Sequence, residues 1–72
     1  MTLNNVPEGS EVIVKNILVD DEEIKSFLFT LGCYSGEAVT VDTKKKSGIV
    51  LSIKDGRYNI DNELAELIET EE

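Results

Sequence analysis

The stretch 37–60 constrains the fold most, because its apolar and polar residues alternate along the chain. A period of two is typical of β-strands that bury one face. The residues expected to face the core are Val39, Val41, Ile49, Leu51, Ile53, Tyr58 and Ile60. The polar segment Lys44–Gly48 and the pair Asp55-Gly56 predict tight turns between these strands. The pattern therefore predicts three consecutive antiparallel strands.

A further strand is predicted over Glu11–Leu18, which is rich in β-branched residues. It follows a predicted tight turn at Val6–Gly9, with proline in the second position. The tail, from Asp61 onward, contains six acidic residues and no basic residue. Its apolar residues permit a helical turn, and Leu67–Thr70 is expected to form a last short strand.

Between the first two strands the period becomes helical. One helix stripe, with spacing i, i+3, i+4 and i+7, is formed by Ile24, Phe27, Leu28 and Leu31. We expect Asp20 to cap the start of this helix and Glu23 to complete a capping box. Gly32 stands where a left-handed residue commonly ends a helix.

Five short strands in so small a chain must protect their edges, and a closed or partly closed barrel does so. We therefore predict a mostly β fold with one or two short helices, a small SH3-like, partly open antiparallel barrel. An OB-like barrel fits the same pattern, but the connection lengths favour the SH3-like one. We expect one domain over residues 1–72.

Charge and composition exclude several functions. The chain has 72 residues, 15 acidic against 7 basic side chains, a formal net charge of −8, one cysteine and no histidine. The charge opposes nucleic acids and anionic membranes. No apolar run is long enough to span a bilayer, and a lone thiol without a signal-peptide pattern indicates a cytoplasmic protein. The sequence offers no set of catalytic residues.

Three segments together suggest a family. They are Val6–Gly9, the segment 31–41 with its pattern L-G-x-x-x-G-x-x-V-x-V, and the hairpin 55–60. Their order resembles that of the ferrous iron transport protein A family, FeoA. The resemblance covers about Leu3 to Thr70. It implies an SH3-like domain, a cytoplasmic location and association with the ferrous-iron permease FeoB, which would recruit the chain to the inner face of the membrane. It implies no catalytic residues.

Two groups are candidate metal ligands. Carboxylates are hard donors suited to Fe²⁺, and four of them follow one another: Asp20, Asp21, Glu22 and Glu23. A helix cap explains them without a metal, and weak Fe²⁺ binding is the alternative. Cys33 is a soft donor without a second thiol or a histidine beside it, so we interpret it as a small apolar residue in a turn.

Phe29 and Tyr34 are the candidate partner-binding residues. Phe29 lies about 140° from Ile24 on a helical wheel, away from the core stripe. It either packs under a loop or contributes to a partner surface, and Tyr34 stands close enough in sequence to flank it. The cluster Lys44–Lys46 is interpreted as protection of a strand edge, and the acidic tail as a solvated face.

The leading hypothesis is a non-enzymatic accessory protein of ferrous iron uptake that docks on a FeoB-type permease and modulates it. A second hypothesis is a direct Fe²⁺ carrier or sensor, and a third is a generic protein-interaction adaptor. No nucleic acid is expected as a partner, and the oligomeric state is left open.

Overall fold

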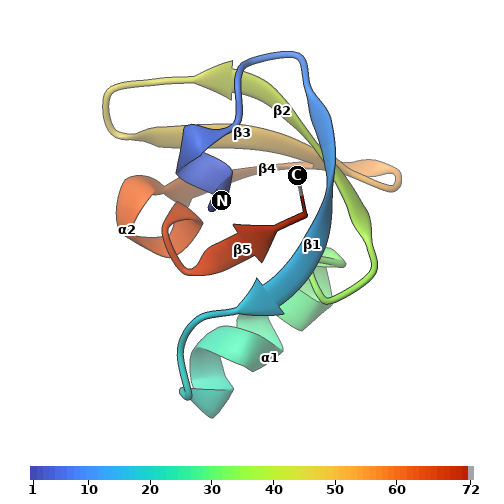
Figure 1. Cartoon of the computed structure of the whole chain (residues 1–72), viewed down its shortest axis with the longest axis vertical. Coiled ribbons are helices and arrows are strands. Elements are labelled where there is room, and N and C mark those ends of the chain that lie inside the picture. The colour runs from blue at the N-terminus through green and yellow to red at the C-terminus, as the bar shows by residue number, and fades with distance from the viewer. Residues whose placement is uncertain (72) are drawn as a thin grey trace.

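The computed structural model describes residues 1–71 and is dominated by antiparallel strands (Figure 1). The strands are β1 (Glu11–Ile17), β2 (Ala38–Lys44), β3 (Gly48–Ile53), β4 (Gly56–Asp61) and β5 (Ile68–Thr70). The helices are α1 (Glu22–Leu31), α2 (Asn62–Ala65) and the short 3₁₀ helix η1 (Leu3–Asn5). The predicted mostly β class, with short helices, is confirmed.

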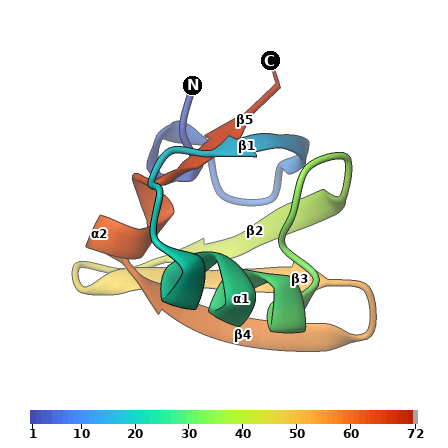
Figure 2. The same cartoon turned by 90° about the horizontal axis from the view of Figure 1, so that it is seen from below.

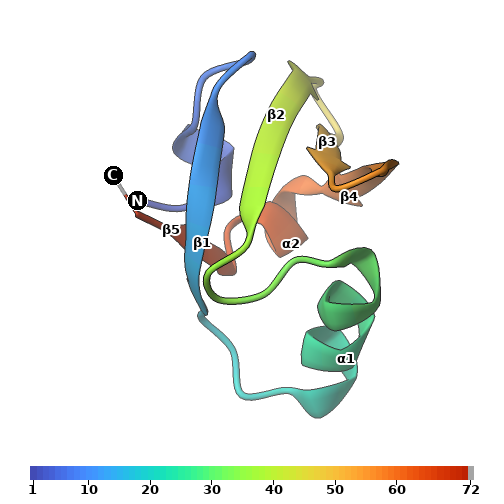
Figure 3. The same ribbon diagram turned by 90° about the vertical axis from the view of Figure 1, so that its right-hand side faces the viewer.

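The strands form one sheet in the order β4-β3-β2-β1-β5, and every neighbouring pair is antiparallel. The register shifts between Val14 and Asn16 in β1 and between Val41 and Thr43 in β2. Such bulges bend and twist a strand, which helps the sheet to curl into a partly open barrel. Figure 3 shows β1 and β2 side by side along the wall of this barrel.

The core is built largely from the residues that the alternating pattern singles out. Val39, Val41, Ile49, Leu51, Ile53 and Ile60 are all buried, and Tyr58 is half-buried against them. Leu3 and Val6, from the start of the chain, and Ala65 and Ile68, from its tail, belong to the same cluster. The two ends of the chain therefore contribute to the interior of the barrel.

The first and last parts of the described chain also pair with each other. The backbone N–H of Thr70 donates to the carbonyl oxygen of Met1 at 2.8 Å, and Thr2 forms an antiparallel bridge with Glu69. The predicted helical turn and last strand of the tail are both present, although the strand begins at Ile68 rather than Leu67.

The start of α1 differs from the prediction by one residue. The cap is Asp21, not Asp20, since Asp21 Oδ1 accepts hydrogen bonds from the N–H groups of Glu23 at 2.9 Å and Ile24 at 3.3 Å. Asp20 lies outside the helix and pairs with Lys25 at 3.7 Å. Glu23 is therefore the second helical residue, one position too early for the expected capping box.

Two turns also lie one residue away from their predicted places. The first turn is closed by the N–H of Ser10 donating to the carbonyl oxygen of Pro7 at 3.2 Å, with Gly9 at φ 83°. In the second, Ile53 pairs with Gly56, so Lys54 and Asp55 form the turn. Lys54 adopts φ 53°, and Gly56 instead provides space, because an added Cβ there would meet the ring of Tyr58.

The predicted burial of Phe27 is wrong. Of the stripe on α1 only Leu28 is fully buried, Ile24 and Leu31 are half-buried, and Phe27 is 50% exposed. The reason is the position of α1, which lies across one end of the barrel rather than on a broad sheet face (Figures 1 and 2). A narrow contact covers fewer helix residues than the full apolar stripe.

Candidate functional site

The helix α1 exposes two phenylalanines on opposite flanks. Phe27 is 50% exposed and Phe29 is 63% exposed. Two residues along an α-helix correspond to a rotation of about 200°, so these two rings border different surfaces. We call the surface beside Phe29 the aromatic patch and the surface beside Phe27 the helix groove.

The aromatic patch brings together the two residues that the sequence singled out for partner binding. The rings of Phe29 and Tyr34 stack with a centroid distance of 4.8 Å and an interplanar angle of 30°. The ammonium nitrogen of Lys54 lies 5.4 Å from the centroid of the Tyr34 ring, within cation–π range. A role of this patch in partner binding stays a prediction.

Lys54 ties the β3–β4 turn to the segment that follows α1. Its Nζ donates a hydrogen bond to Tyr34 Oη at 3.2 Å and forms an ion pair with Glu37 at 3.2 Å. These hydrogen bonds, to Tyr34 first and then to Glu37, raise the pKa of Lys54 above its usual value. Lys54 is fully cationic at neutral pH and holds the Tyr34 side of the patch in place.

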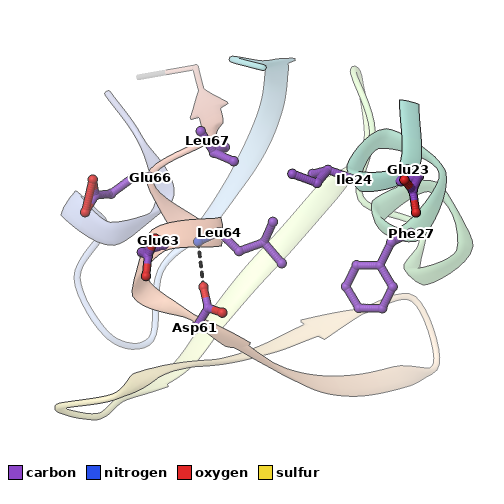
Figure 4. Close-up of a pocket in the computed structure, with 8 residues that line it drawn as sticks. All are labelled: Glu23, Ile24, Phe27, Asp61, Glu63, Leu64, Glu66 and Leu67. Carbon is purple, nitrogen blue, oxygen red and sulfur yellow. Dashed lines mark hydrogen bonds between the residues drawn. The ribbon is translucent and has the colours of Figure 1, made fainter. Parts of the chain in front are cut away.

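The helix groove lies between α1 and α2, which are far apart in the sequence (Figure 4). It has a volume of about 620 Å³. Its lining residues are Glu23, Ile24, Phe27, Asp61, Glu63, Leu64, Glu66 and Leu67. Figure 4 shows Ile24 of α1 and Leu64 of α2 pointing toward each other across it. The groove is thus apolar at its centre.

Every charged residue that lines the groove is acidic. Asp61 Oδ1 accepts a hydrogen bond from the N–H of Leu64 at 2.7 Å and caps α2. Glu23, Glu63 and Glu66 take part in no ion pair within the part of the chain that the structure describes. In Figure 4 the Glu66 side chain points away from α1. Glu23 on α1 and Glu63 on α2 are the other two lining carboxylates that form no ion pair within the described residues.

The sequence pattern does not predict this groove, for two reasons. Phe27 occupies a position of the helical stripe that is usually buried, so the pattern places it in the core. The acids of the tail have no partner in the local sequence, so the pattern indicates a solvated face. A signal was nevertheless present, since two apolar residues of the tail, Leu64 and Leu67, stand at the i, i+3 spacing of one helix face.

The candidate metal ligands do not come together. The carboxylate of Asp21 is engaged in capping, that of Asp20 faces Lys25, and Glu22 and Glu23 are exposed on α1. Cys33 is buried, and its burial raises the pKa of the thiol to about 11. Within residues 1–71 no three acidic or cysteine side chains are grouped as a metal would require. These residues therefore form no preassembled set of ligands, and metal binding by them stays a prediction.

The helices of residues 1–71 are all too short or too polar to cross a membrane.

A family model and several solved structures match this chain. The family model described as FeoA domain matches residues 1–72. A crystal structure of an iron uptake regulatory protein (FeoA) is 24% identical, with a TM-score of 0.88 over 97% of this chain and 93% of that chain. No curated protein was found to match in sequence.

Two other solved structures have a similar fold. Stenotrophomonas maltophilia FeoA complexed with zinc, described as a procaryotic SH3 domain protein, is 21% identical, with a TM-score of 0.85 over 99% of this chain and 89% of that chain. A manganese-dependent transcriptional repressor is 16% identical, with a TM-score of 0.84 over 94% of this chain but 39% of that chain. The SH3-like architecture predicted from the sequence is confirmed.

Proposed function

Because this chain belongs to the FeoA family, which is associated with ferrous iron transport, we propose that it is a non-enzymatic accessory protein of that process. It docks, as one module, on a FeoB-type permease and modulates it. In this proposal the protein is cytoplasmic, and the permease recruits it to the inner face of the membrane.

One observation carries this proposal: α1 fully buries a single apolar side chain and exposes two phenylalanines. Scattered exposed apolar residues are common on proteins. Here, however, one ring lines a groove and the other stacks on Tyr34, and exposed apolar surface gathered in this way is typical of interaction sites. Aromatic side chains often dominate the binding energy of protein interfaces. We therefore assign α1, with Phe27 and Phe29, as the docking element.

The test is co-purification of the chain with the detergent-solubilised permease. The wild-type chain is expected to be retained, whereas the double variant Phe27→Ala/Phe29→Ala is expected to be lost, because its aromatic anchors are removed. Glu11→Gln serves as a control, since Glu11 is exposed and begins β1, at the end of the strand opposite to the one that leads to α1. A wild-type chain that is not retained, together with iron uptake unchanged by its deletion, would falsify the proposal.

A second candidate function is direct handling of Fe²⁺. It is supported by the zinc complex of Stenotrophomonas maltophilia FeoA, which shows that a protein of similar fold can hold a divalent metal. Anaerobic titration with Fe²⁺ separates the two functions. Saturable binding tighter than millimolar, lost in Asp20→Asn/Glu22→Gln, would favour the carrier, whereas its absence leaves the accessory role alone.

A further inference from the structure

We propose that the helix groove binds a short amphipathic segment of a partner protein, in which an apolar side chain is flanked by lysine or arginine. This inference rests on the proposed role of α1 as a docking element and names the chemistry of what it docks. It concerns the Phe27 flank of the helix and not the aromatic patch.

The centre of the groove is apolar and is formed by two separate elements. Phe27 and Ile24 come from α1, whereas Leu64 and Leu67 come from α2 and the residues after it, so the groove joins two elements that do not follow each other in the chain. Phe27 is 50% exposed, and Ile24 and Leu64 are half-buried. An apolar side chain inserted between these two walls removes surface from water on both, which is the usual driving force for a helix-in-groove interaction.

The rim of the groove is acidic. Glu23 and Glu63 flank the apolar centre from opposite sides, and neither forms an ion pair within residues 1–71. Like charges around one concave surface raise the local negative potential, and no lysine or arginine among residues 1–71 lines the groove to offset it. Ammonium or guanidinium groups of a partner fit this rim, and they speed association as well as selecting the partner.

The same charges exclude other occupants. A phosphate or an anionic lipid headgroup is repelled by the rim carboxylates. A second copy of this chain brings a further formal charge of −8 and repels the first across any contact that has no compensating bases. A basic segment of a different protein is the occupant that satisfies both the apolar centre and the acidic rim.

The probe is a synthetic helical peptide with leucines at i and i+4 flanked by lysines, and its twin carries glutamate in place of every lysine. Fluorescence anisotropy with the full chain measures the two dissociation constants. The lysine peptide is expected to bind, and to bind about tenfold more weakly when salt rises from about 0.05 to about 0.5 M. Equal affinities for the twins, or no binding of either, overturns the inference.

Variants locate the site. Glu23→Lys/Glu63→Lys is expected to weaken binding of the lysine peptide by about tenfold or more, and Phe27→Ala by a similar factor. The matched control is Glu11→Lys/Glu71→Lys, which makes the same change in net charge at exposed positions outside the groove. Phe29→Ala controls for the other flank. A loss of affinity as large in the charge control as in the groove variant means that only net charge acts, and contradicts the inference.

Failure of this inference can be told apart from failure of the proposed function. A permease that still retains the groove variants, while losing Phe29→Ala, overturns the inference and keeps the docking role. A lysine peptide that binds in the groove, with no retention of the wild-type chain by the permease, overturns the permease as partner and keeps the inference.

Discussion

The ring of Phe29 stacks on the ring of Tyr34 at a centroid distance of 4.8 Å, whereas Phe27, two residues earlier, lies on the other flank of the same helix. The two phenylalanines of α1 therefore serve different surfaces, one aromatic and joined to Lys54, the other apolar and rimmed by carboxylates. A single short helix offers a partner two contacts of distinct chemistry.

Substitutions of Phe27 and of its neighbour Leu28 should lower the stability of the protein by different amounts. Phe27→Ala is expected to lower the free energy of unfolding by less than about 1 kcal/mol, because half of the side chain is already in water. Leu28→Ala removes a fully buried side chain and should cost about 2–5 kcal/mol. Urea denaturation measures both. A large loss of stability in Phe27→Ala would mean that this ring belongs to the core.

The cap of α1 offers a test between adjacent residues. Asp21→Ala removes the acceptor of two backbone N–H groups and is expected to cost about 1 kcal/mol of stability. Asp20→Ala removes only an exposed ion pair and should change stability by no more than a few tenths of a kcal/mol. Thermal or urea unfolding distinguishes them, and the reverse order would place the cap at Asp20.

The turn residue Lys54 combines a left-handed backbone with a side chain that makes contacts. Lys54→Ala keeps the positive φ but loses the contacts with Tyr34 and Glu37, so it is expected to destabilise the protein. Lys54→Gly loses the same contacts but relieves the backbone, and should be about 1 kcal/mol more stable than Lys54→Ala. Denaturant midpoints of the two variants provide the comparison, and equal midpoints would argue against strain at this turn.

The buried thiol of Cys33 should make the stability of the protein decrease at alkaline pH. Burial raises the pKa of its thiol from 9.0 to about 11, so the unfolded chain releases this proton at a lower pH than the folded chain. The stability that the neutral, buried thiol contributes to the folded state is fully present below pH 9.0 and is lost as pH rises toward about 11. Over that window the loss is about 2 kcal/mol.

The control for this prediction is Cys33→Ala, which removes the thiol and leaves every other side chain in place. The difference in unfolding free energy between wild type and variant should decrease across the window. A difference that stays constant with pH contradicts the raised pKa. At neutral pH the native thiol should also react with iodoacetamide far more slowly than in the unfolded chain, since little thiolate is present.

Much of the fold can be predicted from the sequence, because the signals for it are local. Val39 and Val41 share one face of their strand, as Ile49 and Leu51 share one face of theirs. This spacing follows directly from the two-residue period of a β-strand. Gly32 ends α1 at φ 91°, as its position predicts. The errors in the ends of elements are small and also local, since the cap of α1 and two of the turns are displaced by a single residue. Two neighbouring aspartates can each cap a helix, and an aspartate beside a glycine can occupy either of two positions of a turn.

The candidate site could be predicted only in part. The sequence alone determined the strands with their inward-facing residues, the position of the helix and the proximity of Phe29 to Tyr34, because residues close in the chain are constrained by the period of one element. The tertiary structure alone decided that Phe27 is exposed and that Ile24 meets Leu64 across an acidic-rimmed groove. That surface depends on where α1 crosses the end of the barrel and where α2 follows β4, and contacts between segments so distant in the chain leave no periodic signal in either one.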